Sequence, residues 1–175
     1  MPENMDTAQI QSVLQTLGER IATPSRLILI GGGALALPGS PRPTIDIDFI
    51  GDDVSPSELD QAVLRAAKEL NIFAEPVPLE RFIPLPAGNG ERAIKIGKFG
   101  NLEVYVADPY SIALSKLERG FDTDLEDIVF LVQRGFIELV ELERMTEQSL
   151  LRAREFDLNV TDMLAHLQTV RERLK

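Results

Sequence analysis

The sequence contains no cysteine and only one histidine, His166, which removes several kinds of active site. Without cysteine the chain can form neither a disulfide framework nor a thiolate metal site. A single histidine excludes a zinc site built from several histidines and argues against a Ser-His-Asp triad. A functional site in this protein must therefore be built from other side chains.

Long apolar runs are also missing. No run approaches the roughly 18 to 20 residues that a membrane-spanning helix needs. The first residues, MPENMDTAQIQ, lack the basic and apolar regions of a signal peptide. These two features predict a protein without a membrane partner and with a cytoplasmic location.

Positive charge is scarce, with 18 basic against 28 acidic residues and a formal net charge of −10. A protein that binds a long nucleic acid usually neutralises several phosphates, so the net charge argues against an extended nucleic acid as partner. A small anionic substrate escorted by a metal ion remains compatible, because the local charge decides binding at a site.

The remaining composition is that of an ordinary globular protein, with 175 residues, 44% hydrophobic and 26% charged. Periodicity and capping signals predict helices at 6–22, 34–37, 56–70, 109–120, 123–135, 138–153 and 160–174. They predict strands at 27–30, around the segment TIDIDFI, and at 79–85, 92–99 and 102–107. This order predicts an α/β (α+β) fold with a mixed sheet flanked by helices. We expect a domain at 1–135 and a helical C-terminal extension at 136–175, packed on the same domain.

Two carboxylates stand two residues apart in RPTIDIDFI (42–50), where apolar residues alternate with Thr44, Asp46 and Asp48. A strand points alternate side chains to opposite faces, so both carboxylates would project from the same face. One interpretation is a half-exposed strand with an acidic outer face. The other is a cation site, because two like charges on one face repel unless a positive group lies between them.

A glycine cluster, Gly31-Gly32-Gly33, follows the strand at 27–30. The segment 31–36 matches the dinucleotide pattern G-x-G-x-x-G/A, but nearby prolines leave too short a helix for a dinucleotide-binding unit. A tight turn that needs glycine is a second interpretation. In the third, the N–H groups of Gly31 and Gly32 hold phosphate oxygens while Asp46 and Asp48 hold Mg²⁺.

Two segments carry a family resemblance. LILIGGGALAL followed by TIDIDFI resembles the polymerase-β-like nucleotidyltransferase superfamily, in which a glycine turn precedes an Asp-x-Asp strand. The block VADPYSIALSKLERGFDTDLEDIVFLV (106–132) is similar to abortive-infection toxins of the AbiEii type and to their nucleotidyltransferase-like relatives. The resemblance covers about residues 25–135 and implies a minimal nucleotidyltransferase fold.

The resemblance implies roles for individual residues. Gly31 and Gly32 match the phosphate-binding turn, with Thr44 nearby. Asp46 and Asp48 match the ligands of Mg²⁺ or Mn²⁺ and the catalytic carboxylates.

The third carboxylate of the superfamily is best matched by Glu103, with a solvated strand residue as the alternative. Asp108 fits this role less well, because it precedes proline and is more simply a helix N-cap. Lys116 matches a helical lysine that meets the triphosphate. Its alternative is a structural ion pair with Asp124 or Asp127.

The implied activity is transfer of a nucleoside monophosphate from a nucleoside triphosphate to an unidentified acceptor. The alternative is an inactive binding module, such as one half of a toxin–antitoxin pair. Apolar positions in the tail segment FIELVELERM (136–145) then serve as a surface for a protein partner or a homodimer, unless they pack on the chain's own core.

Overall fold

The computed structural model describes residues 5–40 and 46–175, and the chain divides into two compact units. Unit 1 contains the chain up to Pro78 together with Ala93–Ala107. Unit 2 contains Leu79–Arg92 and Asp108–Lys175. The expected domain division at residue 135 remains a prediction, although helices α6 (Pro109–Arg119) and α7 (Asp122–Gln133) fall in unit 2 together with the C-terminal helices.

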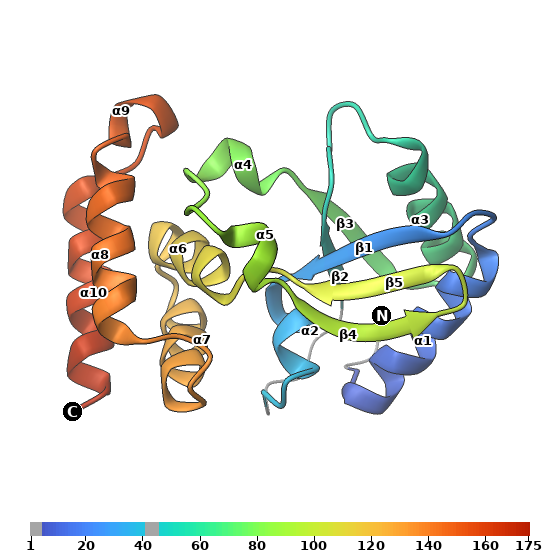
Figure 1. The fold of residues 1–175 in the computed structure, drawn as a ribbon, viewed down its shortest axis with the longest axis horizontal. Coiled ribbons are helices and arrows are strands. Elements are labelled where there is room, and N and C mark those ends of the chain that lie inside the picture. The colour runs from blue at the N-terminus through green and yellow to red at the C-terminus, as the bar shows by residue number, and fades with distance from the viewer. Residues whose placement is uncertain (1–4, 41–45) are drawn as a thin grey trace. The chain divides into compact units, whose positions relative to one another are not determined.

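Unit 1 is built on one five-stranded sheet with the order β3-β2-β1-β5-β4 (Figure 1). Strand β1 (Ser25–Ile30) lies parallel to β5 (Leu102–Val106) and antiparallel to β2 (Asp46–Ile50). Strand β3 (Phe73–Val77) is parallel to β2, and β4 (Ile94–Phe99) is antiparallel to β5. The predicted mixed sheet flanked by helices is therefore confirmed.

Helices α1 (Thr7–Arg20) and α3 (Glu58–Glu69) contact this sheet, while the short α2 (Gly31–Ala36) follows β1 directly. Both longer helices start with a capping box, built by Asp6 with Gln9 and by Ser57 with Asp60. A capping box satisfies two N–H groups at the helix start, so these ends are set locally by the sequence. Their buried residues and the buried residues of the strands form the core of unit 1.

The prediction of a strand at 79–85 is wrong. Residues Leu79–Phe82 form helix α4, and the strand lies earlier, at Phe73–Val77. Leu79 and Ile83 are buried, whereas Arg81, which would share their face in a strand, is exposed; this pattern fits a helical turn. The strand carries Pro76, which normally argues against a strand, but β3 is at the edge of the sheet, where proline is tolerated.

Unit 2 is helical. It contains α4, α5 (Asn89–Arg92), α6 (Pro109–Arg119), α7 (Asp122–Gln133), α8 (Leu139–Leu150), α9 (Ala153–Phe156) and α10 (Val160–Arg173). Helix α10 contacts α6, α7 and α8. In the tail, Ile137 and Leu142 are buried while Val140 is exposed, so part of the apolar stripe packs within the unit. Among the described residues, no helix is long and apolar enough to cross a membrane.

Candidate metal and nucleotide site

Asp46 and Asp48 lie on the same face of β2. Their side chains are half-buried, whereas Ile47 and Phe49 between and after them are fully buried on the opposite face. The strand follows from the alternation in the sequence, since β-branched and aromatic residues pack well on a pleated surface. The two carboxylates are therefore held together by the pleat of a single strand.

The glycine turn lies against Asp48. Ile30, the last residue of β1, is opposite Asp48 in the antiparallel pairing, and Gly31 follows it with a φ of +81°. A methyl group built on the Cα of Gly31 would lie 2.6 Å from Oδ2 of Asp48. Only glycine fits at this position, because a side chain would be strained by the backbone and would collide with the carboxylate. The fold thus brings the backbone of the turn next to a carboxylate oxygen.

The same geometry excludes a dinucleotide-binding unit. In that unit the strands before and after the glycine turn are parallel and a long helix connects them. Here β1 and β2 are antiparallel, and α2 has only six residues. The N-cap residue of α2, Ile30, offers no side-chain hydrogen bond to the N–H groups of the first turn. Because so short a helix has a small dipole, a phosphate here would be held by N–H groups of the turn.

Glu103 is not brought to the carboxylate pair. It is opposite Arg26 in the parallel pairing of β1 and β5, and Arg26 is four residues before Ile30. At about 3.3 Å per residue, this places Glu103 roughly 13 Å along the sheet from the level of Asp48, and two strands away. The side chain of Glu103 instead lies 3.8 Å from the Nζ of Lys95.

The donor set at the Asp46–Asp48 pair fits one hard cation better than two. Carboxylate oxygens are the ligands that Mg²⁺ prefers, and Mg²⁺ usually takes one or two of them together with substrate phosphates. Within 5–40 and 46–175, no three His, Cys, Asp or Glu side chains are grouped so that they could hold a metal ion. Substrate oxygens would have to complete the coordination.

A protein-family model matches nearly the whole chain. A family model described as a nucleotidyltransferase of unknown function (DUF6036) matches residues 7–175. The chain belongs to this family. No curated protein and no solved structure matches the chain. The relationship to abortive-infection toxins is not part of the family's description and stays a prediction.

In this nucleotidyltransferase family member, Lys116 is buried in unit 2. Its Nζ lies 2.8 Å from Asp127 and 3.4 Å from Asp124, and its side chain is only 5% exposed. Asp124 also accepts hydrogen bonds from Arg119 and from the N–H of Phe121, which joins α6 to α7. These contacts are the structural use that the sequence left open as the alternative to a phosphate contact.

Asp108 and His166 also have structural roles. Asp108 caps α6 by accepting a hydrogen bond from the N–H of Tyr110, and its carboxylate receives two bonds from Arg92 at 2.8 and 2.9 Å. These bonds raise the pKa of Arg92 above its ordinary value. Nδ1 of His166 lies 2.6 Å from the carbonyl oxygen of Leu117, within the helical unit. Thr44 lies outside the described residues.

Strand β3 contributes two residues that sequence reasoning missed. Phe73 is opposite Asp46 and Glu75 is opposite Asp48 in the parallel pairing of β2 and β3, so both share the face of the carboxylates. Phe73 is 60% exposed. No local signal identified them, because the strand itself was expected elsewhere.

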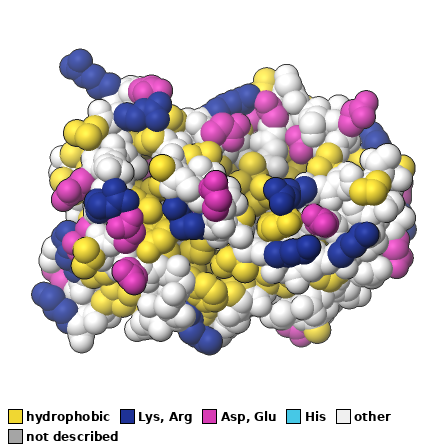
Figure 2. All heavy atoms as spheres, viewed as in Figure 1, with side chains coloured by type: hydrophobic (Ala, Val, Ile, Leu, Met, Phe, Trp, Pro, Cys, Tyr) yellow, Lys and Arg dark blue, Asp and Glu magenta, His cyan; other side chains and the backbone are white. Residues whose placement is uncertain are grey.

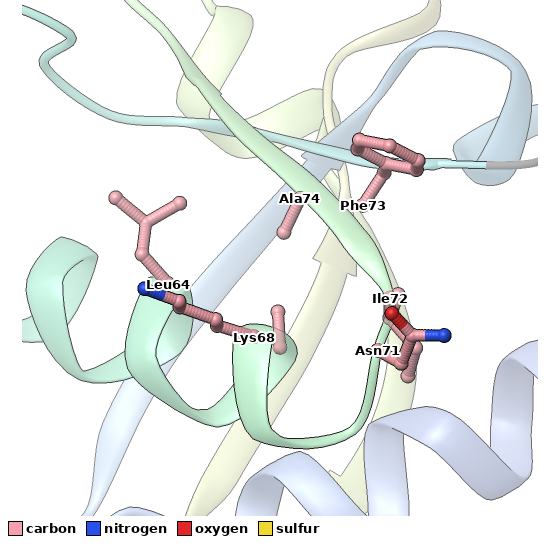
Figure 3. Close-up of a pocket in the computed structure, with 7 residues that line it drawn as sticks. Leu64, Lys68, Asn71, Ile72, Phe73 and Ala74 are labelled. Carbon is pink, nitrogen blue, oxygen red and sulfur yellow. The ribbon is translucent and has the colours of Figure 1, made fainter. Parts of the chain in front are cut away.

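A pocket of about 280 Å³ lies on the other side of β3, against α3. Figure 3 shows Ala74 pointing toward α3 and the ring of Phe73 on the opposite side of the strand. Leu64 and Lys68 of α3 line this pocket as well. Phe73 also lines this pocket, whereas Asp46 and Asp48 do not.

Proposed function

We propose that the chain binds a nucleoside triphosphate together with Mg²⁺ or Mn²⁺ at Asp46, Asp48 and the glycine turn. It then transfers the nucleoside monophosphate to an acceptor. The observation that carries the proposal is the contact of the Gly31 turn with the carboxylate of Asp48. That contact joins N–H donors for phosphate to oxygen donors for a cation, and the family description names the same activity.

The residues of the chain would divide the work of binding. The N–H groups of Gly31 and Gly32 would donate to phosphate oxygens, and Asp46 and Asp48 would hold the cation. When bound, the cation offsets the negative charges of carboxylates and phosphates and polarises the phosphoryl group. Most of the catalysis would then be positioning and charge neutralisation by groups that the sheet already holds in place.

Phe73 would bind the nucleobase. Its ring is exposed and stands beside Asp46 on the same face of the sheet. A base that stacks on an aromatic ring gains about 1–3 kcal/mol, and every base offers a flat face for this contact. The base, the phosphates and the cation would therefore lie side by side across β3, β2 and the glycine turn.

A thermal-shift titration tests the proposal. We expect at least one of the four nucleoside triphosphates to raise the melting temperature of the protein at millimolar concentration when Mg²⁺ or Mn²⁺ is present. The reason is mass action, since a ligand that binds only the folded state stabilises it. Asp48→Asn should abolish the shift, whereas the matched change Asp53→Asn, on an exposed loop residue, should leave it intact. An unchanged melting temperature with all four triphosphates would overturn the proposal.

The second candidate is a binding module that holds the metal–nucleotide complex without transferring anything. The position of Glu103 favours it, because the carboxylate expected to complete a two-metal site is opposite Arg26 instead of near Asp48. This candidate predicts the same thermal shift but no release of pyrophosphate with any acceptor. It also predicts that the protein co-purifies with a partner protein from its native host.

A further inference from the structure

Three exposed cations gather on the sheet face that carries Asp46 and Asp48. Arg26 of β1 and Lys95 and Lys98 of β4 are exposed, in a chain whose net charge is −10. Figure 2 shows Lys and Arg side chains around an acidic one over β1, β5 and β4. We call Arg26, Lys95 and Lys98, with Tyr105 between them, the basic strip.

Register shows that the strip and the carboxylate pair share one face. Ile30 is opposite Asp48, and Arg26 and Ile28 share the face of Ile30 because side chains alternate along β1. Arg26 is opposite Glu103, and Ile28 is opposite Tyr105. On β4, Lys98 is opposite Glu103 and Lys95 is opposite Tyr105.

A β-bulge puts both lysines on that face. Lys95 and Lys98 are three residues apart, so in a regular strand they would point to opposite faces. The register of β4 shifts between Lys95 and Gly97, which restores the side-chain direction for Lys98. Bulges often re-aim a side chain beside a functional site. The basic strip is therefore a product of an irregularity in the edge strand.

The remaining contacts of the strip leave most of its donors available. The guanidinium of Arg26 lies 4.3 Å above the ring of Tyr105 and donates one hydrogen bond, at 3.0 Å, to its hydroxyl. The side chain of Lys95 is 57% exposed, and its Nζ lies 3.8 Å from one carboxylate oxygen of Glu103. This ion pair is open to water. Because exposed pairs of this kind contribute little, an anionic ligand can compete for the lysine.

We propose that the basic strip binds the phosphates of a single-stranded nucleic acid whose terminal hydroxyl is the acceptor at Asp46 and Asp48. This inference rests on the proposed function. In the transfer, the hydroxyl oxygen bonds to the α-phosphorus and the bond from that phosphorus to the bridging oxygen of the β-phosphate breaks. Pyrophosphate leaves with the electron pair, and the hydroxyl proton passes to water.

The dimensions favour a strand over a small phosphorylated acceptor. Arg26 lies about 13 Å along the sheet from the level of Asp48, and Lys98 is about 10 Å further across two strands. At the duplex spacing of about 3.4 Å per phosphate along one strand, roughly four nucleotides cover the first distance, and a more extended single strand needs fewer. An acceptor with a single phosphate group would reach only part of this path, whereas a strand carries a phosphate at every nucleotide along it. The net charge of the chain argues against a long duplex, but a strip of three cations is sufficient for a short single strand.

The test measures binding of fluorescein-labelled oligouridylates by anisotropy, without metal or triphosphate. At 50 mM salt we expect a hexauridylate to bind at least 10-fold more tightly than a diuridylate. Three neutralised phosphates predict that raising the salt to 200 mM weakens the hexamer about 20-fold. The triple variant Arg26→Ala/Lys95→Ala/Lys98→Ala should lose 10-fold or more in affinity, together with most of the salt dependence.

A matched control variant separates the effect of local charge in the strip from the effect of the chain's net charge. Arg134→Ala/Arg154→Ala/Lys175→Ala changes the net charge equally at exposed positions of unit 2 and should keep hexamer affinity within 2-fold. Equal binding of dimer and hexamer, equal losses in both triples, or tighter binding of polyglutamate than of the hexamer would each overturn the inference. Because these titrations contain no triphosphate, a failure here leaves the thermal-shift test of the proposed function untouched, and the reverse also holds.

Discussion

The carboxylates of the two units differ in burial and in the groups around them. In unit 2, Asp124 and Asp127 are buried beside Lys116, at 3.4 and 2.8 Å from its ammonium group. In unit 1, Asp46 and Asp48 are half-buried on one strand face, and the backbone of the glycine turn lies beside Asp48. On the neighbouring strand β1, Arg26 lies on the same face, four residues before Ile30, which is opposite Asp48.

This difference separates structural charge from functional charge. A buried charge is tolerated when its partners lie within the same cluster, and removal of one partner leaves the others uncompensated. A pair of like charges that stays accessible can take its compensation from a ligand. Both Lys116 and the Asp pair matched family positions in the sequence, but only the pair retains access to solvent.

The largest effect should come from breaking the buried cluster. Lys116→Ala should lower the free energy of unfolding by about 3–5 kcal/mol, because two buried carboxylates lose their cation. Urea denaturation measures this, with the exposed Lys95→Ala as control at about 0.5 kcal/mol or less. A variant of unchanged stability with a raised KM for the triphosphate would instead support the phosphate contact of Lys116.

Removing the charge of Asp46 or Asp48 should lower the activity of the protein rather than its stability. Asp48→Asn and Asp46→Asn should each reduce nucleotidyl transfer about 100-fold or more, since each loses an electrostatic element of the site. The double variant should be scarcely slower than either single one, because residues that act as a unit are not additive. Pyrophosphate release measures the rate, and additive losses would argue against a shared cation.

The variant Phe73→Ala tests whether the nucleobase binds at Phe73. Loss of a stacking ring should raise the KM for the triphosphate about 10-fold with a smaller change in kcat. Phe82→Ala, an exposed aromatic of unit 2, is the matched control. Equal KM values in both variants would remove Phe73 from the site.

The smallest expected effect is that of Glu103→Gln. At its distance from Asp48 the change should lower transfer less than about 3-fold, and it should raise hexauridylate affinity about 2-fold by removing a negative charge from the strip. A 100-fold loss of transfer would restore Glu103 as the third metal ligand and would count against the binding-module alternative.

Local features of the sequence determined much of this architecture. The alternation around Asp46 and Asp48 was sufficient to predict a strand with both carboxylates on one face, because side-chain direction in a strand depends only on the neighbouring residues. Capping residues likewise predicted helices α3 and α6 to within a few residues. The need for glycine beside the carboxylate strand was also visible, although not the contact between Gly31 and Asp48.

Strand order and register were decided by the tertiary structure alone. Glu103 alternates with apolar residues as a third carboxylate would, yet the pairing of β5 with β1 sets it opposite Arg26. Phe73 joins the site only because β3 pairs with β2, and Lys98 faces the strip only because β4 is bulged. These placements depend on hydrogen bonds between segments far apart in the chain, and a shift of one residue in register would turn each of these side chains to the other face.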